Sequence, residues 1–141
     1  ARLAWQVSVL GDAGSGLAPV ELVVRGDNRA VGDFFGSAVS APAMPLLTDA
    51  ADWVHIAGGY DSLTGALTLY VNGAKTTSAN SSPGATLTDG GPIVIGSARN
   101  GSDFVAFAGT AFVDDVQFYG EPLADGDVAW LRARPGRALP Q

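Results

Sequence analysis

The chain contains no cysteine and only one histidine, His55. Without cysteine it cannot use a thiol nucleophile or hold zinc through thiolates. With one imidazole it cannot build a metal site from several histidines. Basic residues are also scarce, because 8 Lys and Arg stand against 14 Asp and Glu and leave a net charge of −6. An acidic surface repels nucleic acid and anionic membranes, so we expect neither as a partner.

Long hydrophobic runs are missing as well. No stretch approaches the roughly 20 apolar residues of a membrane-spanning helix, so we expect no membrane insertion. Hydrophobic residues fill 47% of the 141 positions and charged residues 16%, which excludes a disordered acidic tail. The length fits one domain. The 19 glycines and 8 prolines indicate many turns and few long helices.

Apolar and polar side chains alternate through most of the chain, which is the pattern of half-buried strands. Asn72 and Gly73 separate two such segments and predict a two-residue type I′ hairpin, since both residues tolerate positive φ. The alternation predicts strands over residues 3–9, 20–24, 34–39, 53–60, 67–71, 74–79, 92–97 and 110–119.

The end of the chain is the one segment with a helical pattern. Residues 124–134 carry aspartates in the first turn and arginines in the last, which suits the helix dipole, and Pro135 ends the segment. About eight strands with frequent turns predict an antiparallel β-sandwich with one short C-terminal helix. We expect residues 1–134 to form the domain and residues 135–141 to be a tail or linker.

Five motifs follow one another along the chain: WVHIAGGYD at 53–61, LTLYVNG at 67–73, PIVIG at 92–96, FAG at 107–109 and VDDVQFY at 113–119. Their order and spacing resemble the laminin G-like, concanavalin A-like jelly-roll family, particularly its bacterial extracellular members. The resemblance implies an all-β jelly-roll sandwich. Members of that family usually carry one or two further strands before the position of Arg2. We therefore expect this chain to be a piece whose first strands lie elsewhere or come from another chain.

The same resemblance implies an extracellular or cell-surface module that binds carbohydrate or a protein surface at a rim of loops. We single out Tyr60, Asp61, Asn100 and Asp103 as candidate ligand contacts. An alternative stays open for each of them. Asp and Asn side chains also cap turns, and aromatic rings also pack in cores.

The sequence offers no catalytic motif. Its two glutamates, Glu21 and Glu121, are isolated rather than paired as in a glycosidase. No Gly-x-Ser-x-Gly turn supplies a serine nucleophile for His55. We therefore expect no enzymatic activity and interpret His55 as a partly buried, hydrogen-bonded structural residue.

Calcium is the one cofactor that the resemblance suggests. In concanavalin-like folds, the first carboxylate of a pair such as Asp114–Asp115 often holds a structural Ca²⁺, which makes Asp114 the metal candidate. Calcium takes six to eight oxygen ligands, so Asp114 needs partners from the N-terminal region. The open alternative is that one aspartate hydrogen-bonds a neighbouring turn and the other is solvated.

A second function class also stays open. The chain could be a structural or assembly domain of a bacterial cell-surface, filament or phage particle. A neighbouring chain would then supply the missing strands, because an open sheet edge is a template for pairing.

Overall fold

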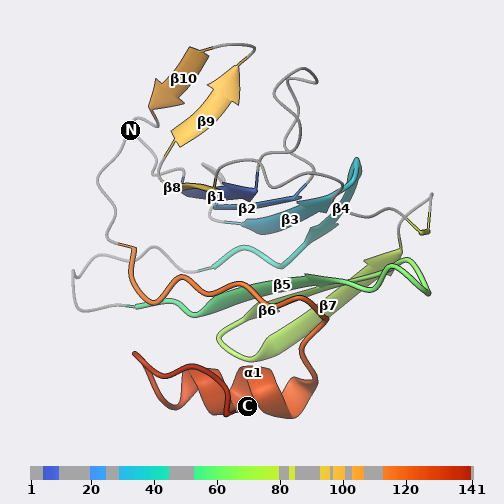
Figure 1. The fold of residues 1–141 in the computed structure, drawn as a ribbon, viewed down its shortest axis with the longest axis vertical. Helices are drawn as coiled ribbons and strands as arrows, with labels where there is room; N and C mark the ends of the chain where they lie inside the picture. Colours follow the sequence, from blue (N-terminus) through green and yellow to red (C-terminus); the bar gives the residue numbers. More distant parts are fainter. Residues whose placement is uncertain are drawn as a thin grey trace.

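The computed structural model describes residues 5–9, 20–24, 29–44, 53–79, 83–84, 93–95, 97–100, 103–106 and 113–140. In this part of the chain, two antiparallel sheets lie face to face, and a helix covers the outer face of the smaller sheet (Figure 1). This arrangement confirms the predicted all-β sandwich with one short C-terminal helix. No helix within these ranges is long and apolar enough to cross a membrane.

The larger sheet has five strands in the order β4-β3-β2-β1-β8. Its members are β1 (Trp5–Val9), β2 (Val20–Val24), β3 (Ala30–Phe34), β4 (Ser37–Ser40) and β8 (Ile93–Ile95). The chain folds β1 to β4 as a meander of neighbouring antiparallel strands, and β8 then joins the free edge of β1.

The expected strand over residues 34–39 is wrong, because the chain turns back there and separates β3 from β4. Phe35 and Gly36 both have positive φ, 51° and 82°, as a two-residue turn requires. The Gly36 N–H also donates to Asp33 Oδ1 at 3.2 Å. The apolar alternation hid this turn, because Phe35 is an unusual residue for a left-handed conformation.

The smaller sheet contains β5 (Ile56–Tyr60), β6 (Ala66–Val71) and β7 (Ala74–Ala79) in that order. The turn between β6 and β7 confirms the predicted hairpin, since Asn72 has φ 50° and Gly73 has φ 86°. Within the described residues, β5 pairs with β6 alone, so its other side is an open edge.

Two further expectations need correction. The segment expected as one strand over 92–97 is divided between β8 and β9 (Ser97–Asn100), and β9 forms a separate hairpin with β10 (Asp103–Ala106). The part of the expected last strand that is described, residues 113–119, pairs with none of the described strands. Asp115 has a φ of 53° there, and this turn in the backbone is incompatible with continuous strand pairing.

The core lies between the two sheets and draws on both. Phe34 and Val39 come from the larger sheet, Leu67 and Leu69 come from β6, and all four are at most 3% exposed. The side chains of Phe34 and Leu22 pack against two glycines, Gly32 of the larger sheet and Gly58 of the smaller sheet. A Cβ on Gly32 would lie 2.7 Å from Phe34 Cε2, and one on Gly58 would lie 2.5 Å from Leu22 Cδ2. Because glycine has no side chain, Gly32 and Gly58 leave room for Phe34 and Leu22 between the two sheets.

Helix α1 (Asp125–Arg132) packs on the outer face of the smaller sheet and agrees with the predicted segment. Its N-terminus is closed by Asp127, whose Oδ2 accepts the Ala124 N–H at 3.1 Å. Val128 is 1% exposed at the sheet. Asp125 accepts hydrogen bonds from Tyr70 Oη at 2.6 Å and from Lys75 Nζ at 2.7 Å, and these contacts fasten the helix to β6 and β7.

Candidate ligand-binding cavity

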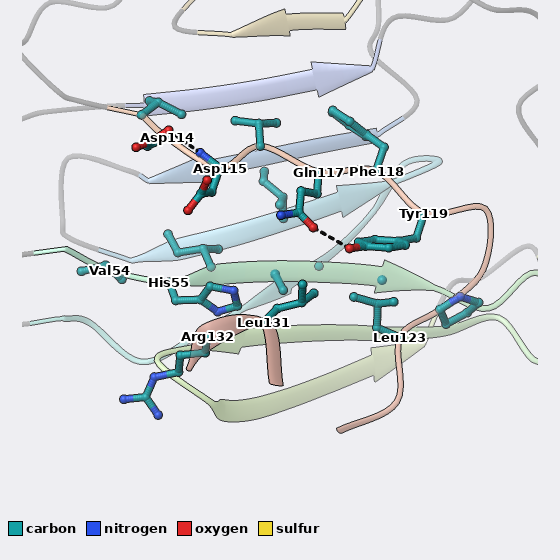
Figure 2. A pocket seen from close by; sticks show the side chains of 18 of the residues that line it. Val54, His55, Asp114, Asp115, Gln117, Phe118, Tyr119, Leu123, Leu131 and Arg132 are labelled. Atoms are coloured by element: carbon teal, nitrogen blue, oxygen red, sulfur yellow. Dashed lines mark hydrogen bonds between the residues drawn. The ribbon is translucent and has the colours of Figure 1, made fainter. Parts of the chain in front are cut away.

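A cavity of about 1000 Å³ lies beside the open edge of β5 (Figure 2). Its wall is formed by β5 and residues 53–55 before it, by residues 113–123, and by the end of α1 with the chain that follows. Leu22, Phe34 and Phe35 of the larger sheet also line it. Small-molecule sites commonly measure ~300–1000 Å³ and combine apolar walls with a few polar groups, so this cavity is the candidate site.

Exposed apolar side chains gather at this cavity. Six large hydrophobic residues are exposed in the described part of the chain, and four of them line the cavity. Trp53 is 59% exposed, Phe118 is 48% exposed and Tyr119 is 36% exposed. These aromatic side chains are exposed to water. A ligand that covers them removes apolar surface from water, which favours binding.

His55 supplies a polar group in the same wall. Its backbone N–H donates to Asn72 Oδ1 at 3.0 Å, and its carbonyl accepts the Asn72 N–H at 2.8 Å, so the β6–β7 turn fixes its position. Its side-chain Nδ1 is buried and has no hydrogen-bond partner among the described residues. Burial, and secondarily the positive charge of Arg132, lower the pKa of His55 below its usual value. The imidazole is therefore neutral at physiological pH.

The C-terminal residues hold the far wall of the cavity in place. The Gly136 N–H donates to Asp115 Oδ2 at 2.6 Å, and Gln117 Nε2 donates to the Arg137 carbonyl at 3.0 Å. The Leu139 N–H donates to Tyr119 Oη at 3.3 Å. Residues 135–141 were predicted to be a tail or linker, and these bonds attach the described part of that segment to residues 115–119.

The four residues that the sequence predicted as ligand contacts lie in three different parts of the fold. Tyr60 lines the cavity, with its ring 5.0 Å from that of Phe35 and 6.4 Å from that of Phe34. Asp61 follows β5 but closes a turn, since its carboxylate accepts hydrogen bonds from Thr64 Oγ1 and from backbone N–H groups. The Thr64 hydroxyl, followed by those N–H groups, lowers the pKa of Asp61.

Asn100 and Asp103 lie together in a third part of the fold. They stand opposite each other in the β9–β10 hairpin, on the other side of the larger sheet from β5 (Figure 1). The fold therefore brings these two together but does not bring them to Tyr60 or to the cavity. A role for them in ligand binding stays a prediction.

Asp114 lines the cavity beside Asp115. Its Oδ1 accepts the Asp115 N–H at 2.8 Å. In the described part of the chain, no group of three or more His, Cys, Asp or Glu residues could hold a metal ion. Calcium also takes carbonyl oxygens as ligands, and calcium at Asp114 stays a prediction.

Sequence reasoning selected Tyr60 but missed the exposed aromatic residues of this cavity, Trp53, Phe118 and Tyr119. The sequence gives no sign that Trp53 is exposed, although 59% of it is. Phe118 was placed within a regular strand. The only signal in the sequence was the clustering of Val116, Phe118 and Tyr119 in one short motif. This clustering does not show which of these side chains are left uncovered by other parts of the fold.

The fold and the site define a jelly-roll sandwich with a cavity at a sheet edge. Residues 6–129 match the family model of the concanavalin A-like lectin/glucanases superfamily, in its laminin G type. The match spans most of the 141 residues, and the chain belongs to this family. The predicted resemblance is thereby confirmed. No curated protein sequence matches the chain.

Two solved structures superpose on the chain, one of them well enough to compare the fold. A native heptameric SAP-like pentraxin from Limulus polyphemus superposes with a TM-score of 0.63 at 18% identity, covering 92% of this chain and 67% of the pentraxin chain. An S-layer domain-containing protein from Clostridium thermocellum superposes with a TM-score of 0.46 at 18% identity, covering 86% and 59% of the two chains. At such identities, the pentraxin likeness supports the jelly-roll fold alone.

Proposed function

We propose that this chain is a non-catalytic, extracellular or cell-surface module that binds carbohydrate in the cavity beside β5. The family to which it belongs fits a carbohydrate- or protein-binding module. The observation that carries the proposal is the presence of three exposed aromatic side chains, Trp53, Phe118 and Tyr119, in the lining of the cavity.

The chemistry of the wall suits a sugar. A pyranose ring has an apolar C–H face, which packs on flat aromatic rings, and a rim of hydroxyl groups, which needs hydrogen-bond partners. Gln117 and Asn72, which also line the cavity, carry amide groups. Apolar walls with a few polar groups that fix orientation are the usual composition of a specific small-ligand site.

The absence of catalysis is supported by the acidic groups that line the cavity. Asp114 and Asp115 are adjacent in sequence, and each accepts a backbone N–H. A glycosidase instead places two carboxyl groups on opposite sides of the scissile bond. Glu121, the remaining acidic residue of the wall, belongs to no paired-carboxylate motif.

A glycan and polysaccharide panel tests the proposal, run with calcium and again with a chelator. We expect at least one glycan to bind, and Phe118→Ala and Trp53→Ala to weaken that binding. Leu63→Ala is the matched control, because Leu63 is 92% exposed and lies outside the cavity wall. Loss of binding on chelation would place calcium in the site and make Asp114 the next residue to substitute. No binding in either condition would overturn the carbohydrate proposal.

A second candidate is the assembly domain, favoured by the open edge of β5. An unpaired edge strand presents N–H and C=O groups that can bind a strand from another chain. Size-exclusion chromatography with light scattering distinguishes the two candidates. A sugar-binding monomer elutes at 14.3 kDa, whereas an assembly domain forms larger, concentration-dependent species.

A further inference from the structure

The open edge of β5 presents a definite set of main-chain groups. At one end of the strand the His55 carbonyl accepts an N–H on the β6 side at 2.8 Å, and at the other end the Asp61 N–H donates to a carbonyl on the β6 side at 2.9 Å. Main-chain groups of successive strand residues point to alternate sides. Ile56 and Gly58, which stand one and three residues after His55, therefore direct their N–H and carbonyl groups to the open edge.

The edge groups of Ile56 and Gly58 have no main-chain partner in the described part of the chain, where β5 pairs with β6 alone. Gly58 is exposed although it stands in the middle of its strand, and it has no side chain that could cover its backbone. Main-chain N–H and C=O groups that a ligand covers must be hydrogen-bonded, because leaving them unpaired costs free energy. An occupant of this edge therefore needs donors and acceptors at the spacing of a strand.

The cavity offers apolar surface on both sides of this edge. Toward the larger sheet, a Cβ on Gly58 would lie 2.5 Å from Leu22 Cδ2 and 3.0 Å from Phe34 Cζ, so these two side chains face the edge from the core. Toward α1, Leu123 and Leu131 line the same cavity. The residues of β5 itself carry no charge. A strand added here would be covered on both faces, so it needs uncharged side chains, above all on its core face.

Residues 113–119 bound the same space. They run beside β5 and line the same cavity (Figure 2), and they pair with none of the described strands. Three of their side chains, those of Asp115, Gln117 and Tyr119, follow one another at every second position and bond to the backbone of the tail. The space beside the β5 edge thus has a second side, which favours one extended peptide over the sheet edge of another folded domain.

We infer that the open edge of β5 binds one extended peptide segment of another chain, antiparallel to β5, with apolar side chains toward Leu22 and Phe34. This inference rests on the second candidate function, the assembly domain, and names its partner. Every strand pair in the described structure is antiparallel. In an antiparallel pair, the residues opposite Ile56 and Gly58 return both main-chain bonds and place their side chains on the same, core-facing side. Main-chain bonds then supply affinity, and the apolar contacts supply specificity.

The test uses a peptide in which valine and threonine alternate between two terminal lysines, so that the valines can face the core. Binding to the unmodified chain is measured by calorimetry. A methyl group on the backbone nitrogen of the central valine removes an N–H that points to β5 and should weaken binding about tenfold or more. The matched control is the same methyl group on the neighbouring threonine, whose N–H points away from β5, and it should weaken binding less than about threefold. Hydrogen exchange of the Ile56 and Gly58 amides should slow in the complex.

The outcomes separate this inference from the function on which it rests. Weaker binding of the valine-methylated peptide alone, with slower exchange at Ile56 and Gly58, supports it. Equal binding of both methylated peptides, the reverse order, or no binding of the parent peptide overturns it. If the chain still forms concentration-dependent species in light scattering, the assembly function stands on another surface. If it stays a monomer and binds no peptide, the assembly candidate fails together with this inference, and the glycan panel decides the carbohydrate proposal independently.

Discussion

At the scale of single residues, the approach of the two sheets depends on glycines. A Cβ on Gly58 would lie 2.5 Å from Leu22 Cδ2 and 3.0 Å from Phe34 Cζ. Gly58→Ala should therefore lower the free energy of unfolding by about 1–3 kcal/mol, because the core side chains must shift. Gly126→Ala is the control, since a Cβ at this position of α1 would have nothing within 4 Å. That change should stabilise by about 0.5–1 kcal/mol, as measured by urea unfolding. Equal changes in the free energy of unfolding for the two variants would contradict the close packing of Gly58 against Leu22 and Phe34.

His55 predicts a pH dependence of stability. Its pKa is lowered in the folded chain, mainly by burial, so the unfolded chain takes up a proton more readily. Stability should therefore be constant above about pH 6.5 and fall as the pH drops below that value. Thermal melts between pH 7.5 and pH 5.5 measure this fall. His55→Gln should flatten the profile in this window, and an unchanged slope in the variant would refute the assignment to His55.

At the scale of elements, one contact between α1 and the smaller sheet is the hydrogen bond between Tyr70 and Asp125. Tyr70 Oη donates to Asp125 Oδ1 at 2.6 Å, and the ring is 4% exposed. Tyr70→Phe keeps the ring and removes the hydroxyl, so it should cost about 1–2 kcal/mol in urea unfolding. Tyr119→Phe, at a position 36% exposed, is the control and should cost less. A larger effect at Tyr119 would contradict this view of the helix contact.

The hairpin between β6 and β7 depends on Asn72 in two ways. The residue has a φ of 50°, and its side chain accepts the His55 N–H. Asn72→Ala loses both features and should cost about 2–3 kcal/mol, whereas Asn72→Gly keeps the backbone freedom and should cost about 1 kcal/mol. Equilibrium unfolding of the pair separates the two contributions. Equal costs would show that the backbone conformation carries none of the effect.

At the scale of the whole molecule, the core joins both sheets into one unit. Leu69 is fully buried between residues of the larger sheet and its own. Leu69→Ala should cost about 2–5 kcal/mol, and Leu63→Ala, at an exposed turn, less than about 0.5 kcal/mol. Fluorescence from tryptophans in different elements and far-UV circular dichroism should report one shared transition. Separate midpoints would mean that the sheets unfold independently.

Much of this architecture could be predicted from the sequence, because the local signals were consistent. Alternation placed β2, β6 and β7, and Asn72–Gly73 placed the hairpin between two of them. The turn at Phe35 escaped prediction, because its glycine lies inside an apolar run. The unpaired segment 113–119 escaped as well, since strand pairing depends on long-range neighbours that composition does not show.

The candidate site was less predictable than the fold. Tyr60 and Asp114 were selected and do line the cavity. Trp53 and Phe118 were not selected, because an exposed aromatic and a buried one have the same appearance in a sequence.

The hydrogen bonds between residues 136–139 and residues 115–119 have a practical consequence for binding measurements. A chain cut after Arg134 would lose all three of them and loosen one wall of the cavity. Attaching a sensor surface through the last residues would pull on the same wall. Thr77 and Ser78 of β7 are exposed on a different strand, away from the cavity wall. A single cysteine introduced there would be the safer anchor, because the chain has no native thiol to compete with it.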